Sequence, residues 1–343
     1  MDANHYDPPL IAVVIPFYQK TAGLLTKALT SVIAQTLREP ILPIVADDGS
    51  PVSARAEIQK LPEANRSRVL LLEQANKGAG AARNLALESV PHGTKYVAFL
   101  DSDDTWRPDH LNLAVQTLSA GNDVYFADWW SFNHPHTSNF QRIGALPPDR
   151  HEKITGLTGV YKLGVSPLEH ITKDGGGVIQ TSTVVYDYSK YSKLRFREEF
   201  YNGQDFFFWM DLGELNAEFA FSTTIDAENG EGINIYQGAG WGTDRSLARL
   251  RNEIFVWTSV RRLYQLTPAQ YKSNQKTIKH LEDGVIRDII HRVRRKKPID
   301  KNLLIDIAKY DPMFIARAST WPIRALREKK SNRRQENRKA PTE

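Results

Sequence analysis

Tyr96-Val-Ala-Phe-Leu-Asp-Ser-Asp-Asp-Thr-Trp-Arg-Pro-Asp-His110 is the stretch that indicates the fold. Its apolar start is typical of a buried strand, and three acids follow within four positions: Asp101, Asp103 and Asp104. Such a cluster is self-repulsive unless a cation lies beside it. Two carboxylates spaced as Asp-X-Asp suit a hard divalent metal and, through the metal, a diphosphate.

Strands and helices alternate through the first part of the chain. Short apolar runs predict strands over Leu10–Phe17, Pro40–Ala46, Arg68–Glu73 and Lys95–Leu100. Amphipathic spacing predicts helices over Thr21–Gln35, Ser53–Lys60 and Ala81–Ser89. The alternation indicates an α/β domain with a Rossmann-like, mostly parallel sheet and right-handed crossovers.

Polar residues follow each of the four predicted strands. They lie in Pro16-Phe-Tyr18, Asp47-Asp-Gly-Ser50, Gln74-Ala-Asn-Lys77 and Asp101-Ser-Asp103. Ligands of such sheets bind beyond the carboxyl ends of the strands, so these four strand ends should meet in one crevice. The sequence therefore predicts a ligand site built from segments that are far apart in the chain.

The alternation stops after about residue 120, and the later part of the chain is more irregular. We predict strands over 122–132 and 178–186, a helix over 203–215 and a surface loop over 134–152. The Gly-rich stretch 230–242 predicts a mobile loop. Helical patterns dominate from Leu247 onward.

Composition and charge exclude several function classes. The chain has 343 residues and no cysteine, which excludes disulfides, thiolate chemistry and zinc–cysteine sites. The N-terminus carries no signal-peptide pattern, and no apolar run reaches the ~20 residues that span a bilayer. Residues 287–339 hold 17 Lys or Arg and 6 Asp or Glu. The net charge of this segment is therefore +11. Since the whole chain has a net charge of +5, the rest of it is acidic, with a net charge of −6.

Four motifs, in this order, resemble the successive motifs of the family 2 glycosyltransferases. They are Val13–Tyr18, Asp47–Ser50, Asn76–Gly78 with Ala82–Asn84, and Phe99–Asp104. The resemblance covers about residues 10–225. It implies the GT-A nucleotide-diphospho-sugar transferase fold and an inverting sugar transfer that usually needs a divalent metal, Mn²⁺ or Mg²⁺. The whole chain is also similar to the succinoglycan-type exopolysaccharide glucosyltransferases, which implies UDP-glucose as the donor.

The resemblance also implies a division of the chain. Residues 1–245 would form the catalytic domain, with a donor half over about 10–120 and an acceptor half over about 121–245. Residues 246–343 would form a helical basic extension, in which roughly the last fifteen residues are expected to be disordered.

The family motifs assign twelve residues to the donor site. They are Pro16, Phe17, Tyr18, Asp47, Asp48, Asn76, Lys77, Gly78, Arg83, Asp101, Ser102 and Asp103. By the same resemblance Asp101 and Asp103 hold the metal, which neutralises the leaving diphosphate. Other readings stay open: a turn with Asx-type hydrogen bonds for Asp47 and Asp48, and a cap of the next helix for Asp104.

Gly203-Gln-Asp-Phe-Phe-Phe-Trp-Met210 resembles a later family motif, an acidic pair before an aromatic helix. Asp205 matches the family's general base, because an inverting transfer needs one carboxylate to take the acceptor's proton. Gln204 replaces the usual Glu. A helix N-cap is the alternative role for Asp205, and the two roles are compatible.

Five residues are candidates for the acceptor side or for a lid. Gln204, Trp209 and Thr183 are the acceptor candidates, although a core position is the alternative for Trp209. Many family members carry a histidine after the base, but none lies between His170 and His280 here. Trp241 and Arg245, in a Gly-rich loop, are the candidates to replace it as a lid.

Basic residues are interleaved with Trp, Ile and Phe in the C-terminal region. This pattern suits an anionic membrane surface and fits an acceptor that is a lipid-linked saccharide. No nucleic-acid module is recognised, so nucleic acid is not an expected partner. We expect the protein to be cytoplasmic, peripheral on the inner face of the cytoplasmic membrane, and to act in exopolysaccharide or surface-glycan assembly.

Two other function classes remain compatible with the sequence. A nucleotidyltransferase also uses an acidic metal site, but Pro16-Phe-Tyr-Gln-Lys20 lacks its Gly-rich basic signature. A non-catalytic scaffold that binds a nucleotide-sugar or a membrane would not need Asp205 or the Asp-X-Asp pair, and both are present. The sequence therefore favours an enzyme.

Overall fold

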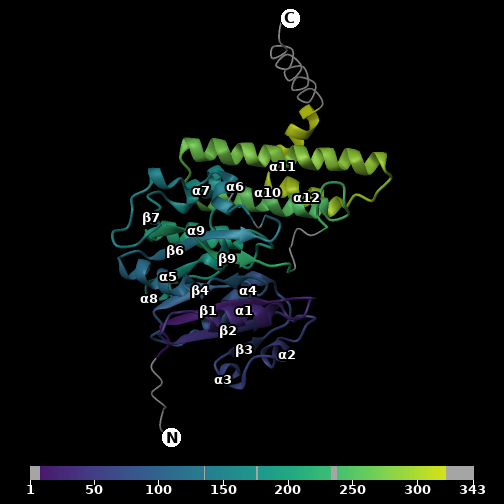
Figure 1. Ribbon diagram of the computed structural model, residues 1–343. Coiled ribbons are helices and arrows are strands. Elements are labelled where there is room, and N and C mark those ends of the chain that lie inside the picture. The colour runs from purple at the N-terminus through teal and green to yellow at the C-terminus, as the bar shows by residue number, and fades with distance from the viewer. Residues whose placement is uncertain (1–7, 135, 175–176, 233–237, 322–343) are drawn as a thin grey trace, which may run out of the picture. The chain divides into compact units, whose positions relative to one another are not determined.

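The computed structural model describes residues 8–134, 136–174, 177–232 and 238–321 (Figure 1). The chain forms two compact units, Met1–Asn234 and Ile235–Glu343. The first unit contains the sheet, and the described part of the second unit is helical. The predicted disordered C-terminal tail lies outside the described residues, as does part of the predicted mobile loop over 230–242.

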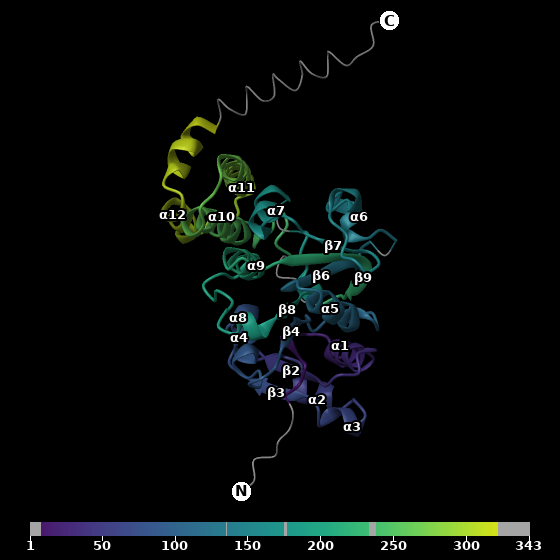
Figure 2. The same ribbon diagram turned by 90° about the vertical axis from the view of Figure 1, so that its left-hand side faces the viewer.

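The described residues form a nine-stranded mixed sheet in the order β3-β2-β1-β4-β8-β6-β9-β5, with β7 paired to β9. Its parallel half is β1 (Ile11–Phe17), β2 (Ile41–Asp47), β3 (Leu70–Glu73) and β4 (Tyr96–Phe99). Its other half is β5 (Thr105–Trp106), β6 (Val124–Ser131), β7 (Val160–Lys162), β8 (Val185–Asp187) and β9 (Phe219–Asn229). β8 pairs antiparallel with both β4 and β6, and so joins the two halves (Figure 2).

The helices of the first unit connect and cover these strands. They are α1 (Leu24–Ile33), α2 (Ala54–Ile58), α3 (Glu63–Arg66), α4 (Ala79–Glu88), α5 (His110–Ser119), α6 (Asn139–Ile143), α7 (Pro167–Asp174), α8 (Tyr188–Tyr191) and α9 (Gln204–Glu214). Two 3₁₀ helices cover Pro148–Arg150 and Thr181–Thr183. The second unit consists of α10 (Ser246–Leu263), α11 (Pro268–Arg294) and α12 (Lys301–Tyr310).

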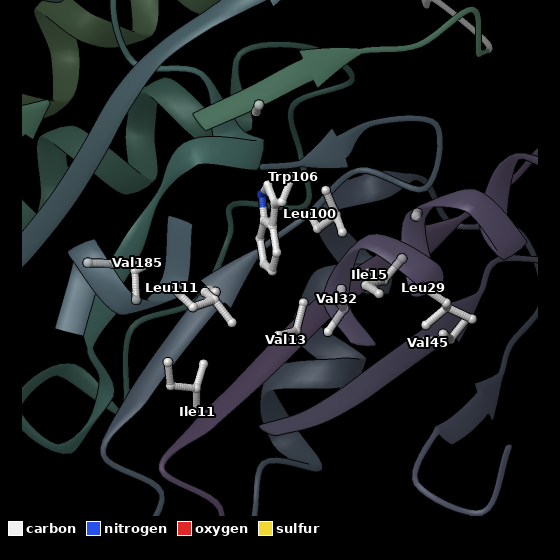
Figure 3. Packing of buried hydrophobic residues seen from close by; sticks show 14 of the residues in the cluster. Ile11, Val13, Ile15, Leu29, Val32, Val45, Leu100, Trp106, Leu111 and Val185 are labelled. Atoms are coloured by element: carbon white, nitrogen blue, oxygen red, sulfur yellow. The ribbon is translucent and has the colours of Figure 1, made fainter. Parts of the chain in front are cut away.

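The core is built around β1, in which all seven residues are buried. A strand covered on both faces needs a continuous apolar run, and its sequence Ile-Ala-Val-Val-Ile-Pro-Phe supplies one. Val13 and Ile15 pack with Leu29 and Val32 of α1 (Figure 3). This packing fixes the position of the strand, so the residues that follow its carboxyl end lie at the edge of the sheet.

The structure differs from the prediction at three places. The predicted strand 178–186 is reduced to β8, because residues 181–183 curl into a 3₁₀ helix. The predicted surface loop 134–152 contains α6 and a 3₁₀ turn. The long strand β9 was not predicted, although the helix before it and the Gly-rich stretch after it were.

A buried ion pair organises the second unit. In α11, Arg292 donates from Nε to Asp288 at 2.6 Å, and its Nη2 donates to the Thr243 carbonyl at 2.7 Å. Asp288 also accepts from the Ser246 hydroxyl at 2.6 Å. These bonds fasten the loop before α10 to α11. None of the helices in the described ranges is long and apolar enough to cross a bilayer.

Candidate active site

The acidic turn after β4 forms an ion pair with α4. Nη2 of Arg83 lies 2.6 Å from Oδ1 of Asp101, and Arg83 is buried with its guanidinium 5.2 Å from the Phe196 ring centre. The Asp101 backbone N–H donates to the Ser182 hydroxyl at 2.9 Å. Asp101 therefore has a fixed backbone and a buried counter-charge, while its side chain is still one-third exposed.

Asp103 is the second acid of the turn. Burial, followed by the charge of Asp101, raises the pKa of Asp103 to about 6. Its Oδ2 accepts from the Gly232 N–H at 3.0 Å. Two nearby carboxylates that repel one another fit a Mg²⁺ or Mn²⁺ ion, which takes one or two protein carboxylates and completes its shell with water and phosphate oxygens. The described residues contain no larger group of His, Asp or Glu arranged for a metal.

Asp104 does not cap a helix, and that interpretation was wrong. α5 begins later, at His110, with Asp109 at its N-cap. The buried Asp104 carboxylate instead accepts from Ser182 Oγ at 2.6 Å, Gln180 Nε2 at 2.9 Å and Gly230 N at 3.0 Å. Burial, with the charges of its two neighbouring acids, raises its pKa well above the usual range. Asp104 thus ties two distant segments, at 180–182 and at 230, to the acidic turn.

Two acids at the end of β2, Asp47 and Asp48, accept hydrogen bonds from nearby loops. Asp48 is buried and accepts from Gln74 Nε2, Lys77 N and Gly78 N, each at 2.8 Å. Asp47 accepts from Ser50 N at 2.8 Å, as an Asx-type turn requires. Asp48 therefore shapes the turn that leads into α4. For Asp47 the structure supports the interpretation that its side chain stabilises a turn.

The end of β1 differs from its predicted role. Pro16 and Phe17 are buried in the strand, so they support the crevice instead of lining it. Tyr18 is the first exposed residue. Gln19 was missed, although it directly follows the motif. Its Nε2 donates to the hydroxyl of the buried Ser102 at 3.1 Å and lies 3.5 Å from Oδ1 of Asp103.

The turn between β3 and α4 presents an open surface. Asn76 and Lys77 are exposed, and Gly78 has a left-handed φ of 93° at the start of α4. A side chain at Gly78 would be strained in this conformation. Further along, Gly80 packs close to Gln204 of α9. The first turns of α4 and α9 therefore lie side by side.

Asp205 lies in the first turn of α9. The N-cap is Gly203, so Asp205 is not the cap. Its Oδ2 accepts from the Thr181 hydroxyl at 3.4 Å, and its Oδ1 accepts from the Phe206 N–H at 3.0 Å. Burial raises the pKa of Asp205, and the charge of Arg83 opposes that rise. A carboxylate with a raised pKa is a stronger base, as proton abstraction requires.

Two acceptor candidates are buried, which contradicts their proposed roles. Trp209 is fully buried, with its ring centre 5.9 Å from that of Phe99, so it belongs to the core. Thr183 is also buried, and its hydroxyl donates to the Gln180 carbonyl at 2.8 Å. Gln204 is largely buried, with no hydrogen-bond partner for its Oε1 among the described residues. The stretch Thr181-Ser-Thr183 as a whole was a candidate for the acceptor side, and Thr181 is the threonine in it that contacts Asp205.

The two lid candidates lie in the second unit. Trp241 is 65% exposed, and its ring centre lies 4.7 Å from that of His291. Arg245 is exposed at the N-cap of α10. The loop that holds Trp241 has no histidine of its own, but His291 of α11 lies against it.

Comparisons with known proteins agree with this geometry. Residues 12–172 match the family described as Glycosyl transferase family 2. The succinoglycan biosynthesis protein ExoW of Rhizobium meliloti (strain 1021) is 29% identical over 92% of this chain and 98% of that protein. The amylovoran biosynthesis glycosyltransferase AmsB of Erwinia amylovora is 27% identical over 61% of this chain and 65% of that protein.

Solved structures share the fold at low sequence identity. S. aureus TarS 1–349 in complex with UDP-GlcNAc has a TM-score of 0.54 and 18% identity, over 90% of this chain and 81% of that one. The mannosyltransferase PcManGT from Pyrobaculum calidifontis, in complex with GDP-Man and Mn²⁺, has a TM-score of 0.52 and 15% identity, over 92% and 84%. The predicted GT-A fold is confirmed.

Proposed function

We propose, from the premise that the chain is a glycosyltransferase with a family 2 domain, that it transfers a hexose with inversion from a nucleotide-diphospho-sugar to a growing saccharide. The observation that carries this proposal is the position of Arg83. It forms an ion pair with Asp101, and its charge opposes the rise that burial causes in the pKa of Asp205. One buried cation therefore acts on both the donor-side acids and the base.

The donor side would lie at the carboxyl ends of β1, β2 and β4. Asp101 and Asp103 would hold Mn²⁺ or Mg²⁺, which neutralises charge on the leaving diphosphate. The turn organised by Asp48, with Lys77 exposed, would receive the nucleoside beside Tyr18. The relatives named for succinoglycan and amylovoran biosynthesis support a role in exopolysaccharide assembly, with UDP-glucose as the donor we favour.

The chemistry requires one base. The acceptor hydroxyl oxygen forms a bond to the anomeric carbon as its proton passes to Asp205. The bond from the anomeric carbon to the diphosphate oxygen breaks, and the electron pair leaves with the nucleoside diphosphate. The raised pKa of Asp205 favours proton uptake in this step. Thr181 holds the carboxylate, so that one of its oxygens can face the acceptor.

The acceptor we propose is a lipid-linked saccharide at the inner face of the cytoplasmic membrane. Arg292 and Arg317 do not serve membrane binding, because both form internal ion pairs with acids of the second unit. Val293, 64% exposed, and the exposed run 294–296 (Arg-Arg-Lys) remain as a basic surface with an apolar residue in it. Such a surface suits anionic lipid.

A panel of nucleotide-sugars with Mn²⁺ or Mg²⁺, scored for sugar hydrolysis and thermal shift, tests this proposal. We expect UDP-hexoses to be hydrolysed slowly and to stabilise the protein. The Asp103→Ala variant should abolish both effects. Pyrophosphate release from a nucleoside triphosphate would indicate a nucleotidyltransferase. Binding without turnover of any donor or acceptor would indicate a scaffold.

A further inference from the structure

The segment directly after β9 contacts both of the inner acids. β9 ends at Asn229. The Gly230 N–H donates to Oδ1 of Asp104 at 3.0 Å, and the Gly232 N–H donates to Oδ2 of Asp103 at 3.0 Å. The backbone of one short segment therefore supplies a hydrogen bond to each of two neighbouring carboxylates.

Space explains why both donors are glycines. A Cβ atom on Gly230 would lie 1.8 Å from the Asp103 carbonyl oxygen. A Cβ atom on Gly232 would lie 2.2 Å from Oδ2 of Asp103. Neither glycine has a left-handed φ, so backbone conformation alone would permit other residues. The close approach to Asp103 is what requires glycine at both positions.

We infer that Gly232 is a positioning residue that fixes the Asp103 carboxylate for a divalent metal, and that Gly230 supports it by holding the neighbouring Asp104. This inference rests on the proposed function. An N–H bond to Oδ2 restricts rotation of the carboxylate, and Oδ1, which lies 3.5 Å from Nε2 of Gln19, can then face a ligand. Partners of this kind orient metal ligands before the ion arrives. Asp104, held by Gly230 and Ser182, keeps the turn itself in place.

Mn²⁺ binding to the full chain, measured by calorimetry, tests the inference. The new Cβ of Gly232→Ala would clash with Oδ2 of Asp103 and so push the N–H away from the carboxylate. We therefore expect this variant to weaken Mn²⁺ binding by about tenfold or more, the cost typical of losing such a partner. Gly177→Ala is the matched control, because a Cβ there meets no atom within 4 Å and its φ is not left-handed. It should leave the affinity unchanged. Thermal unfolding of each variant reports whether the fold is kept.

The outcomes separate this inference from the proposed function. If the unaltered protein binds no Mn²⁺, the metal role of Asp101 and Asp103 fails, and the inference fails with it. If the unaltered protein and Gly232→Ala bind Mn²⁺ equally, the inference alone is overturned. If Gly232→Ala does not fold, hydrogen exchange decides. The Gly232 amide should exchange slowly in the unaltered protein and faster in Asp103→Ala, and equal rates would overturn the inference.

Discussion

The guanidinium of Arg83 lies 2.6 Å from the carboxylate of Asp101, and the charge of Arg83 opposes the rise that burial causes in the pKa of Asp205. The same side chain is buried in α4 against Phe196, so it cannot turn away from Asp101 without leaving a buried charge unpaired. The proposed metal ligand Asp101 and the proposed base Asp205 are therefore linked through the charge of Arg83.

Replacement of Arg83 should shift the pH dependence of the reaction. Asp205 acts as a base only when deprotonated, so activity rises as the pH passes upward through its pKa. Arg83→Gln removes the charge that lowers this pKa, so the acidic limb of kcat/KM should move to higher pH. Arg197→Gln is the control, because Arg197 pairs with Asp211 further along α9. A limb that moves to lower pH, or does not move, would contradict the assignment.

Loss of the base should affect the chemical step more than donor binding. Asp205→Asn keeps the shape of the side chain but cannot take a proton, so kcat should fall by about 10² to 10⁴, the range for general base catalysis. The Kd for the donor should change little. Asp211→Asn, on the same helix, should retain kcat. A variant at Asp205 with normal kcat would exclude Asp205 as the base.

Trp209 should act on stability and not on the acceptor. Its indole is fully buried beside Phe99 and Phe208. Trp209→Ala should lower the free energy of unfolding by about 3–5 kcal/mol, as for other buried aromatic residues. Tyr18→Ala, at an exposed position, should not. Normal stability in Trp209→Ala with weaker acceptor binding would restore the acceptor role.

The first half of the fold could be predicted because its signals are local. The four parallel strands are short apolar runs, and α1 and α9 show helical spacing within one stretch of sequence. The strand-end acids were found in the same way, because the topology of a parallel sheet brings them to one edge. The α/β class and the expected place of a ligand site at the strand ends therefore followed from the pattern, whereas the GT-A fold followed from the resemblance to the family.

The contacts behind the site could not be predicted, because they join residues far apart in the chain. Asp104 accepts from Ser182 and Gln180, which are 78 and 76 residues away. Trp209 lies in a row of four aromatic residues, so helical spacing does not decide which of them faces the core. The burial of Phe17 could not be predicted from spacing either, because a residue at the end of a strand can face the core or a ligand.

Membrane binding should depend on where the positive charge lies along α11 and the residues that directly follow it. Charge reversal of 294–296 (Arg-Arg-Lys) to Glu should weaken flotation with anionic vesicles, since each nearby charge contributes about 1 kcal/mol. The control reverses three exposed lysines of the same helix, Lys272, Lys276 and Lys279. Equal losses in both variants would indicate an effect of net charge alone. No loss in either variant would remove this surface from the proposal.

The central claim is that the acids after β4 bind the donor's diphosphate through a divalent metal. The most direct measurement is calorimetric titration of UDP, with and without Mn²⁺, into the unaltered protein and Asp103→Asn. We predict Mn²⁺-dependent binding that weakens by about tenfold or more in Asp103→Asn, as loss of a metal ligand requires. UDP binding that is independent of Mn²⁺ and equal in both proteins would contradict the account.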